Sequence, residues 1–147
     1  MASIRDQLLH VARLFIASLN EWSLDGVLAI RSPDCIQYTF PASFGKPPMT
    51  NDEFAKLMSN AKPLVQNYKM FYAKGSEAES VTVDVESRKV CLHLKSYTET
   101  KIGPFENEYI FTLYVNKDGE HLDRIEEFLD SACSADFVNR VASLQKE

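Results

Sequence analysis

The sequence predicts an α+β fold in which helices cover one face of a curved antiparallel sheet. Two observations support it: apolar residues repeat at helical spacing before Pro63, and apolar and polar residues alternate over the segments that follow. Because the helices precede a run of strands instead of alternating with them, a layered α+β arrangement is favoured. A strongly bent sheet with three helices before it and one after it would form a cone that encloses a cavity.

Each of the three helices before the sheet follows a serine or threonine that can cap it. The caps are Ser3, Ser23 and Thr50, and Asp6 and Glu53 complete capping boxes behind the first and third. The second helix covers residues 24–30 and ends near Ser32-Pro33, because the residue before a proline avoids the helical region. The third helix ends at Pro63.

One strand is expected before the third helix and five after it. The predicted strands are residues 35–40, 64–73, 80–86, 89–98, 106–115 and 121–129. Turns are expected at Ser87-Arg88 and at Lys117-Asp118-Gly119, and a last helix begins at Ser131 or Ser134. The sequence contains no repeat or linker, so we expect a single domain over residues 1–147.

Composition excludes several classes of function. The net charge is −5 and the basic residues are scattered, which argues against nucleic-acid binding. No apolar run is long enough to span a membrane, and no signal peptide is visible, so an intracellular, cytoplasmic protein is expected. The three cysteines show no CxxC spacing and the three histidines do not cluster, so neither a disulfide framework nor a metal site is expected.

Five segments resemble, in order and spacing, the small SnoaL-like isomerases and cyclases of fungal meroterpenoid gene clusters, in the nuclear-transport-factor-2-like superfamily. They are IRSPDC (30–35), FPASFGKPPMTNDEFAKLM (40–58), DVESRKVCLHLKS (84–96), NEYIF (107–111) and DRIEEFLDS (123–131). The resemblance covers nearly the whole chain. It implies a homodimer of cone-shaped subunits and a cofactor-free enzyme that rearranges a polycyclic polyketide-terpenoid substrate by acid/base chemistry.

Glu127 is the predicted catalytic base, since it begins the acidic-aromatic-x-Asp pattern whose first acid faces the cavity in SnoaL-like enzymes. A carboxylate in an apolar pocket can have its pKa raised toward neutrality. Glu108 depends on the hairpin register. If Val115 pairs with Glu120, Glu108 lies opposite Glu127 and the two acids form a dyad; if the turn is one residue longer, Tyr109 faces Glu127 and Glu108 points away.

Two further residues could take part in catalysis. Histidine side chains in general change charge near neutral pH, so His93 could act as an acid, a base or an oxyanion donor, or it could be a structural residue of its strand. Tyr38, between Ile36 and Phe40, could direct its hydroxyl into the cavity or be an ordinary core tyrosine.

The predicted substrate-binding residues are one cation and four apolar side chains. Arg31 could clamp a carboxylate, either of the substrate or of the protein itself. The apolar walls are Phe40, Phe54, Met58 and Tyr109, which core packing would explain equally well. Two alternatives to an isomerase or cyclase remain: a non-catalytic binding or dimerisation module, and a hydrolase or dehydratase on the same scaffold.

Overall fold

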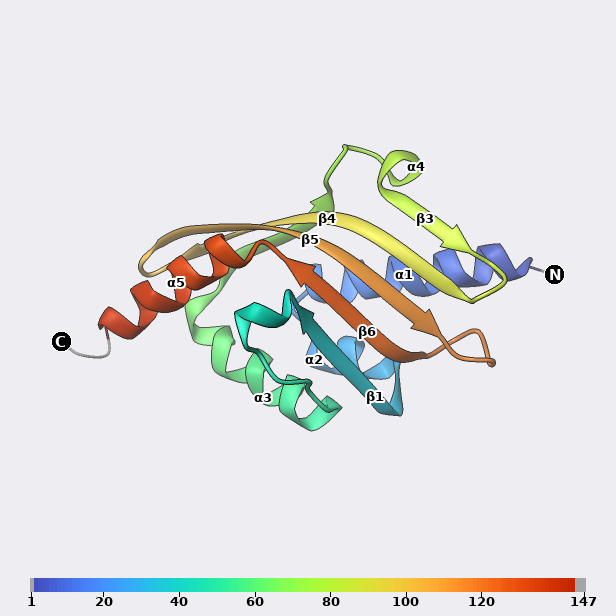
Figure 1. Ribbon diagram of the computed structural model, residues 1–147, viewed down its shortest axis with the longest axis horizontal. Coiled ribbons are helices and arrows are strands. Elements are labelled where there is room, and N and C mark those ends of the chain that lie inside the picture. Colours follow the sequence, from blue (N-terminus) through green and yellow to red (C-terminus); the bar gives the residue numbers. More distant parts are fainter. Residues whose placement is uncertain (1, 145–147) are drawn as a thin grey trace.

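The computed structural model describes residues 2–144, so Met1 and residues 145–147, the ends of the predicted domain, lie outside the described part. The helices are α1 (Ile4–Asn20), α2 (Leu24–Ala29), α3 (Asn51–Ala61), α4 (Glu77–Ser80) and α5 (Ser131–Leu144), with 3-10 turns η1 (Ala42–Phe44) and η2 (Lys62–Leu64). The strands are β1 (Arg31–Phe40), β2 (Gln66–Tyr72), β3 (Val81–Asp84), β4 (Lys89–Thr100), β5 (Gly103–Val115) and β6 (Leu122–Leu129) (Figure 1). The predicted α+β fold is confirmed.

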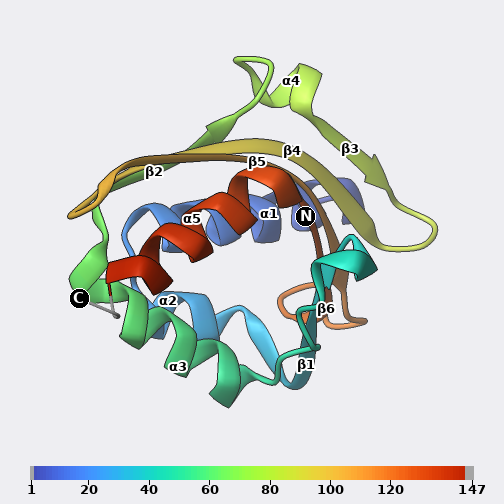
Figure 2. The same cartoon turned by 60° about the vertical axis from the view of Figure 1, so that its left-hand side comes forward.

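The six strands form one sheet in the order β1-β6-β5-β4-β2, and β3 also pairs with β4. It arches over α1 and α5, while α2 and α3 lie below these two helices in the view of Figure 2. All strand pairs are antiparallel, as expected, except β1 and β6, which run parallel. The parallel pair arises because the chain leaves β1 through α3 and enters the sheet again at its other edge, so that β6 returns beside β1.

Most strand boundaries differ from the predictions by one to three residues, and two differences are larger. β1 begins at Arg31, four positions early, because Arg31 already pairs with Leu122 and a register shift before Ile36 absorbs Ser32-Pro33. The short helix α4 between β2 and β3 was not predicted, since four residues give no periodic pattern.

The predicted helix caps are all formed. The Ser3 side chain accepts from the Asp6 backbone N–H and the Thr50 side chain from that of Glu53, and both acids complete the capping box. Ser23 Oγ accepts from the backbone N–H of Gly26 at 3.0 Å. These caps satisfy backbone donors that the first helical turn leaves unpaired. Among residues 2–144, no helix is both long and apolar enough to cross a bilayer.

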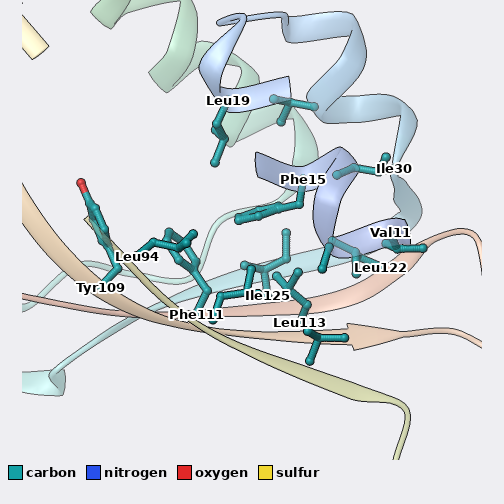
Figure 3. Packing of buried hydrophobic residues seen from close by; sticks show 14 of the residues in the cluster. Val11, Phe15, Leu19, Ile30, Leu94, Tyr109, Phe111, Leu113, Leu122 and Ile125 are labelled. Carbon is teal, nitrogen blue, oxygen red and sulfur yellow. The ribbon is translucent and has the colours of Figure 1, made fainter. Parts of the chain in front are cut away.

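The fully buried part of the core lies between the sheet and α1 (Figure 3). Leu113 and Ile125 are fully buried on the inner face of β5 and β6, against the apolar stripe of α1 (Figure 3). Phe15 of α1 meets Phe111 edge to face, with ring centroids 5.1 Å apart. The earlier residues of β5, from Phe105 to Tyr109, lie beyond this packed region, where the interior is hollow.

Candidate active site

A cavity of about 320 Å³ lies between the concave face of the sheet, the end of α1, α3 and α5. Most of its walls are apolar, as is usual for a site that binds a hydrophobic small molecule. Its charged lining residues are three: Arg31 of β1, Lys46 of the loop after η1, and Glu127 of β6. No three His, Cys, Asp or Glu side chains gather as a metal-binding group within residues 2–144.

The hairpin of β5 and β6 places Glu127 opposite Phe111. Both predicted registers were therefore wrong, because the loop is longer than either allowed: the Asn116 backbone N–H donates to the carbonyl of His121 at 2.8 Å. Side chains alternate between the two faces of a strand, so the observed register still points Tyr109 and Glu108 to the faces expected from the longer of the two predicted turns. Tyr109 shares the inner face with Glu127, and Glu108 lies on the outer face.

A short chain of hydrogen bonds holds the Glu127 carboxylate. Arg31 Nη2 donates to Gln37 Oε1 at 2.7 Å, and Gln37 Nε2 donates to Glu127 Oε2 at 3.0 Å. An arginine has only donors, so the amide oxygen of Gln37 must face Arg31 and its NH₂ group must face Glu127. Glu127 Oε1 makes no hydrogen bond within residues 2–144.

Gln37 is held from its backbone as well. Its N–H donates to the carbonyl of Met49, and the N–H of Met49 donates back, both at 2.9 Å. The side chain is 3% exposed. Gln37, which donates to Glu127, is therefore held in position without a bound ligand.

Burial has opposite effects on the two ends of this chain. It raises the pKa of Glu127 above the ordinary value, because the favourable effects of Lys46, the Gln37 hydrogen bond and Arg31 do not offset the loss of hydration. Burial lowers the pKa of Arg31 to about 10, so the guanidinium stays charged at neutral pH. The guanidinium carbon lies 4.1 Å from the centroid of the Phe54 ring, which covers it.

Two tyrosines supply neutral hydrogen-bonding groups on the same wall. The Tyr109 hydroxyl and Ser96 Oγ are 2.8 Å apart, and Tyr109 directs its hydroxyl away from the packed core (Figure 3). Burial raises the pKa of Tyr109 and of Tyr68, so both hydroxyls keep their protons at neutral pH. Asn107 Nδ2 donates to Ser134 Oγ at 2.7 Å and ties α5 to β5 at the edge of the cavity.

The predicted candidates divide between the two faces of the sheet. Glu127 and the predicted substrate-binding residues Arg31, Phe54, Met58 and Tyr109 line the cavity. The other four lie on the outer face, away from the cavity; they are Glu108, His93, Tyr38 and Phe40. The reason is that successive side chains of a strand point to opposite faces of the sheet, and each of these four residues is next to a residue that points inward. For Glu108 this is the facing expected from the longer of the two turns.

The four outward residues have partners there. His93 Nε2 and Glu108 Oε2 are 2.5 Å apart. The Arg124 guanidinium lies 3.9 Å from the centroid of the Tyr38 ring, and Phe40 stacks on a phenylalanine of β6. These contacts are typical of a structural surface.

Gln37, Lys46 and Tyr68 are among the cavity residues that were not predicted. Gln37 shares a face of β1 with Cys35 and Thr39, and this alternation was the available sequence signal. These three residues are less apolar than the set that contains Tyr38, so the sequence favoured the other face as the inner one. Lys46 lies on an irregular loop, where no periodic signal exists.

Comparisons with known proteins agree with this architecture. No protein-family model matches the chain. It is 35% identical over 133 residues to austinoid biosynthesis clusters protein H of Penicillium brasilianum, which covers 90% of this chain and 88% of that protein. Its fold matches that of BvnE pinacolase from Penicillium brevicompactum with a TM-score of 0.90 and 29% identity, over 97% of this chain and 99% of that one.

A structure from Shewanella denitrificans assigned to the SnoaL-like polyketide cyclases matches with a TM-score of 0.71 over 90% of this chain and 96% of that one. At 10% identity this likeness concerns the fold alone. The resemblance drawn from the sequence segments is therefore confirmed at the level of fold and relatives. The chain belongs to the family of the austinoid biosynthesis cluster proteins and has a SnoaL-like fold.

Proposed function

We propose that this protein is a cofactor-independent isomerase or cyclase that rearranges a polycyclic meroterpenoid intermediate by acid/base catalysis. The observation that carries the proposal is the Glu127 carboxylate, which is held in an apolar cavity and has a raised pKa. A base of this kind retains affinity for protons nearer to neutral pH than an exposed glutamate does. Relatives named for austinoid biosynthesis and a pinacolase of the same fold support the substrate class and a rearrangement.

In the proposed reaction, Glu127 Oε1 removes a proton from a carbon next to a substrate carbonyl. Gln37 holds Oε2 during the transfer, so the carboxylate does not rotate away. The negative charge moves from Glu127 to the substrate oxygen as an enolate forms, and the fixed positive charge of Arg31 remains nearby to stabilise it. The proton on Oε1 then returns to a different carbon or to oxygen, so the reaction needs no net proton, electron or water.

The hollow interior argues for this function over a non-catalytic module of the same fold. A module that only binds other proteins is expected to fill its interior with side chains and to leave its acids in water. Here about 320 Å³ is unfilled, and one carboxylate is inside.

Incubation with a keto-lactone meroterpenoid in heavy water tests the reaction class. We expect an isomeric product in which one deuterium has replaced one hydrogen of the substrate, because the Glu127 carboxyl proton exchanges with water in the cavity between removal and return. The measurement is mass spectrometry of the product, with a reaction in ordinary water and one without protein as controls. A product heavier or lighter by one water would instead indicate a hydrolase or a dehydratase.

We also propose that the protein forms a homodimer through the outer face of the sheet. Phe71, Ile110 and Phe128 are 46%, 39% and 54% exposed on this face, and Ile110 is paired with Phe128 across adjacent strands. Apolar side chains grouped on one surface often mark an interface.

Light scattering should give the mass of a dimer for the parent protein and that of a folded monomer for Ile110→Lys. Lysine at this position would place a charge in an apolar contact. Val85 is similarly exposed, at 40%, but lies in the turn after β3, so Val85→Lys is the matched control and should remain a dimer. A parent protein that is monomeric at high concentration would contradict the proposal.

A further inference from the structure

The cavity has an excess of positive charge. Its charged lining residues are the cations Arg31 and Lys46 and the single carboxylate Glu127. When Glu127 accepts a proton, both cations remain without a counter-charge in the lining. An apolar enclosure of this composition favours a ligand that carries a negative charge or develops one during reaction.

Arg31 cannot contact such a ligand directly. Its Nη2 donates to Gln37, while Nε and Nη1 are buried, have no partner within residues 2–144 and present no open surface to the cavity. The ring of Phe54 covers the guanidinium. Arg31 therefore acts on the site through its field and through Gln37, and a contacting cation has to come from elsewhere.

Lys46 is placed to make that contact. It follows Gly45, whose φ of +81° turns the loop, and it precedes Pro47-Pro48, which stiffens it. Three residues later Met49 is hydrogen-bonded to Gln37, so the loop is attached beside the residue that holds Glu127. The side chain of Lys46 lines the cavity and makes no ion pair with any carboxylate of residues 2–144.

We propose that Lys46 is a substrate-contacting residue whose ammonium binds an oxyanion of the substrate, a carboxylate or an enolate, while Glu127 faces the reacting C–H bond. The substrate is then an acidic carbonyl compound and not a neutral hydrocarbon or alcohol. This inference rests on the proposed function, because it assumes that the cavity is the reaction site. The apolar remainder of the substrate would extend toward α5, where a smaller hollow of about 160 Å³ shares Leu64, Thr100 and Phe137 with the main cavity.

Binding of two matched cage compounds tests the inference without requiring turnover. Adamantane-1-carboxylate and adamantane-1-carboxamide have nearly the same shape and differ in charge. Dissociation constants are measured by calorimetry at neutral pH, and the emission of Trp22, the one tryptophan of the chain and a cavity residue, reports entry into the cavity. We expect the carboxylate to bind the parent protein about tenfold more tightly than the amide, or better.

Three variants distinguish the effect of Lys46 on carboxylate binding from the effect of positive charge on the protein surface. In Lys46→Met the preference for the carboxylate should be lost, and in Lys46→Arg it should be retained. Lys56 is exposed on α3 and does not line the cavity, so Lys56→Met should keep the preference of the parent.

The outcomes distinguish this inference from the proposed function. Equal binding of both compounds to the parent, or an unchanged preference in Lys46→Met, would overturn the role of Lys46 and leave the role of Glu127 standing. Absence of any Trp22 response and of any heat with both compounds would overturn the cavity as a binding site, and with it both proposals.

Discussion

The Glu127→Gln variant is expected to lose two to four orders of magnitude in turnover while it keeps the fold, because it removes the proposed base and little else. Glutamine has the shape of glutamate, and its carbonyl oxygen can still accept the hydrogen bond from Gln37 Nε2. Product formation under single-turnover conditions measures the loss. Circular dichroism and a thermal melt establish that the variant is folded.

The matched control is Glu126→Gln. Glu126 is the preceding residue on β6, but it faces outward and accepts a hydrogen bond from the Tyr114 hydroxyl at 2.6 Å. Its substitution removes the same charge from the same strand and should leave turnover within a few-fold of the parent. Full activity of Glu127→Gln would remove Glu127 as the base.

The raised pKa of Glu127 adds a dependence on pH, whose sign follows from linkage. A carboxyl group with a raised pKa in the folded state resists ionisation there, so folding is penalised as the pH rises above the ordinary value of 4.5. The penalty is absent below that pH and complete above the folded-state pKa. Glu127→Gln should therefore melt at the same temperature as the parent in acid and at a higher temperature at neutral pH, and the acid limb of the activity profile should lie above 4.5.

The Leu113→Ala variant is expected to lose about 2–5 kcal/mol of unfolding free energy. Leu113 is 0% exposed on the inner face of β5, between Val90 of β4 and Ile125 of β6, so truncation leaves a cavity that its neighbours cannot readily fill. Denaturant melts followed by circular dichroism measure the change.

Ile4→Ala is the control for this prediction. Ile4 is 45% exposed at the start of α1, and removal of a similar amount of side chain there should cost less than about 1 kcal/mol. If the two variants lost the same stability, burial on the inner face of β5 would not be the source of the effect.

Much of the fold could be predicted because it depends on local patterns. The capping boxes at Ser3 and Thr50 define helix starts through hydrogen bonds within four residues, and all were formed as expected. The strand segments follow from alternation and turn residues. The parallel pairing of β1 with β6 could not be predicted in this way, because it joins the first and the last strand of the chain, which are distant in sequence.

The site was predicted only where side-chain facing could be inferred correctly. On β1 the more apolar set contains Tyr38 and Phe40, yet it is Gln37 and Thr39 that are buried on the inner face, and Gln37 lines the cavity. Polarity usually marks the solvent side of a strand, and a polar site inside a hollow fold reverses that rule. The register of the β5–β6 hairpin failed for a different reason, since it depended on the length of a loop whose end at His121 was not evident from the sequence.

The pairing of β1 with β6 also constrains how the protein becomes active during synthesis. Gln37 and Glu127 are separated by 90 positions, so the proposed base is translated long after the residue that orients it. A nascent chain that has not yet emerged beyond residue 122 contains neither the proton acceptor nor the neighbour of its first strand. Catalytic competence should thus arrive late and all at once, and no amino-terminal fragment of the chain should retain part of it.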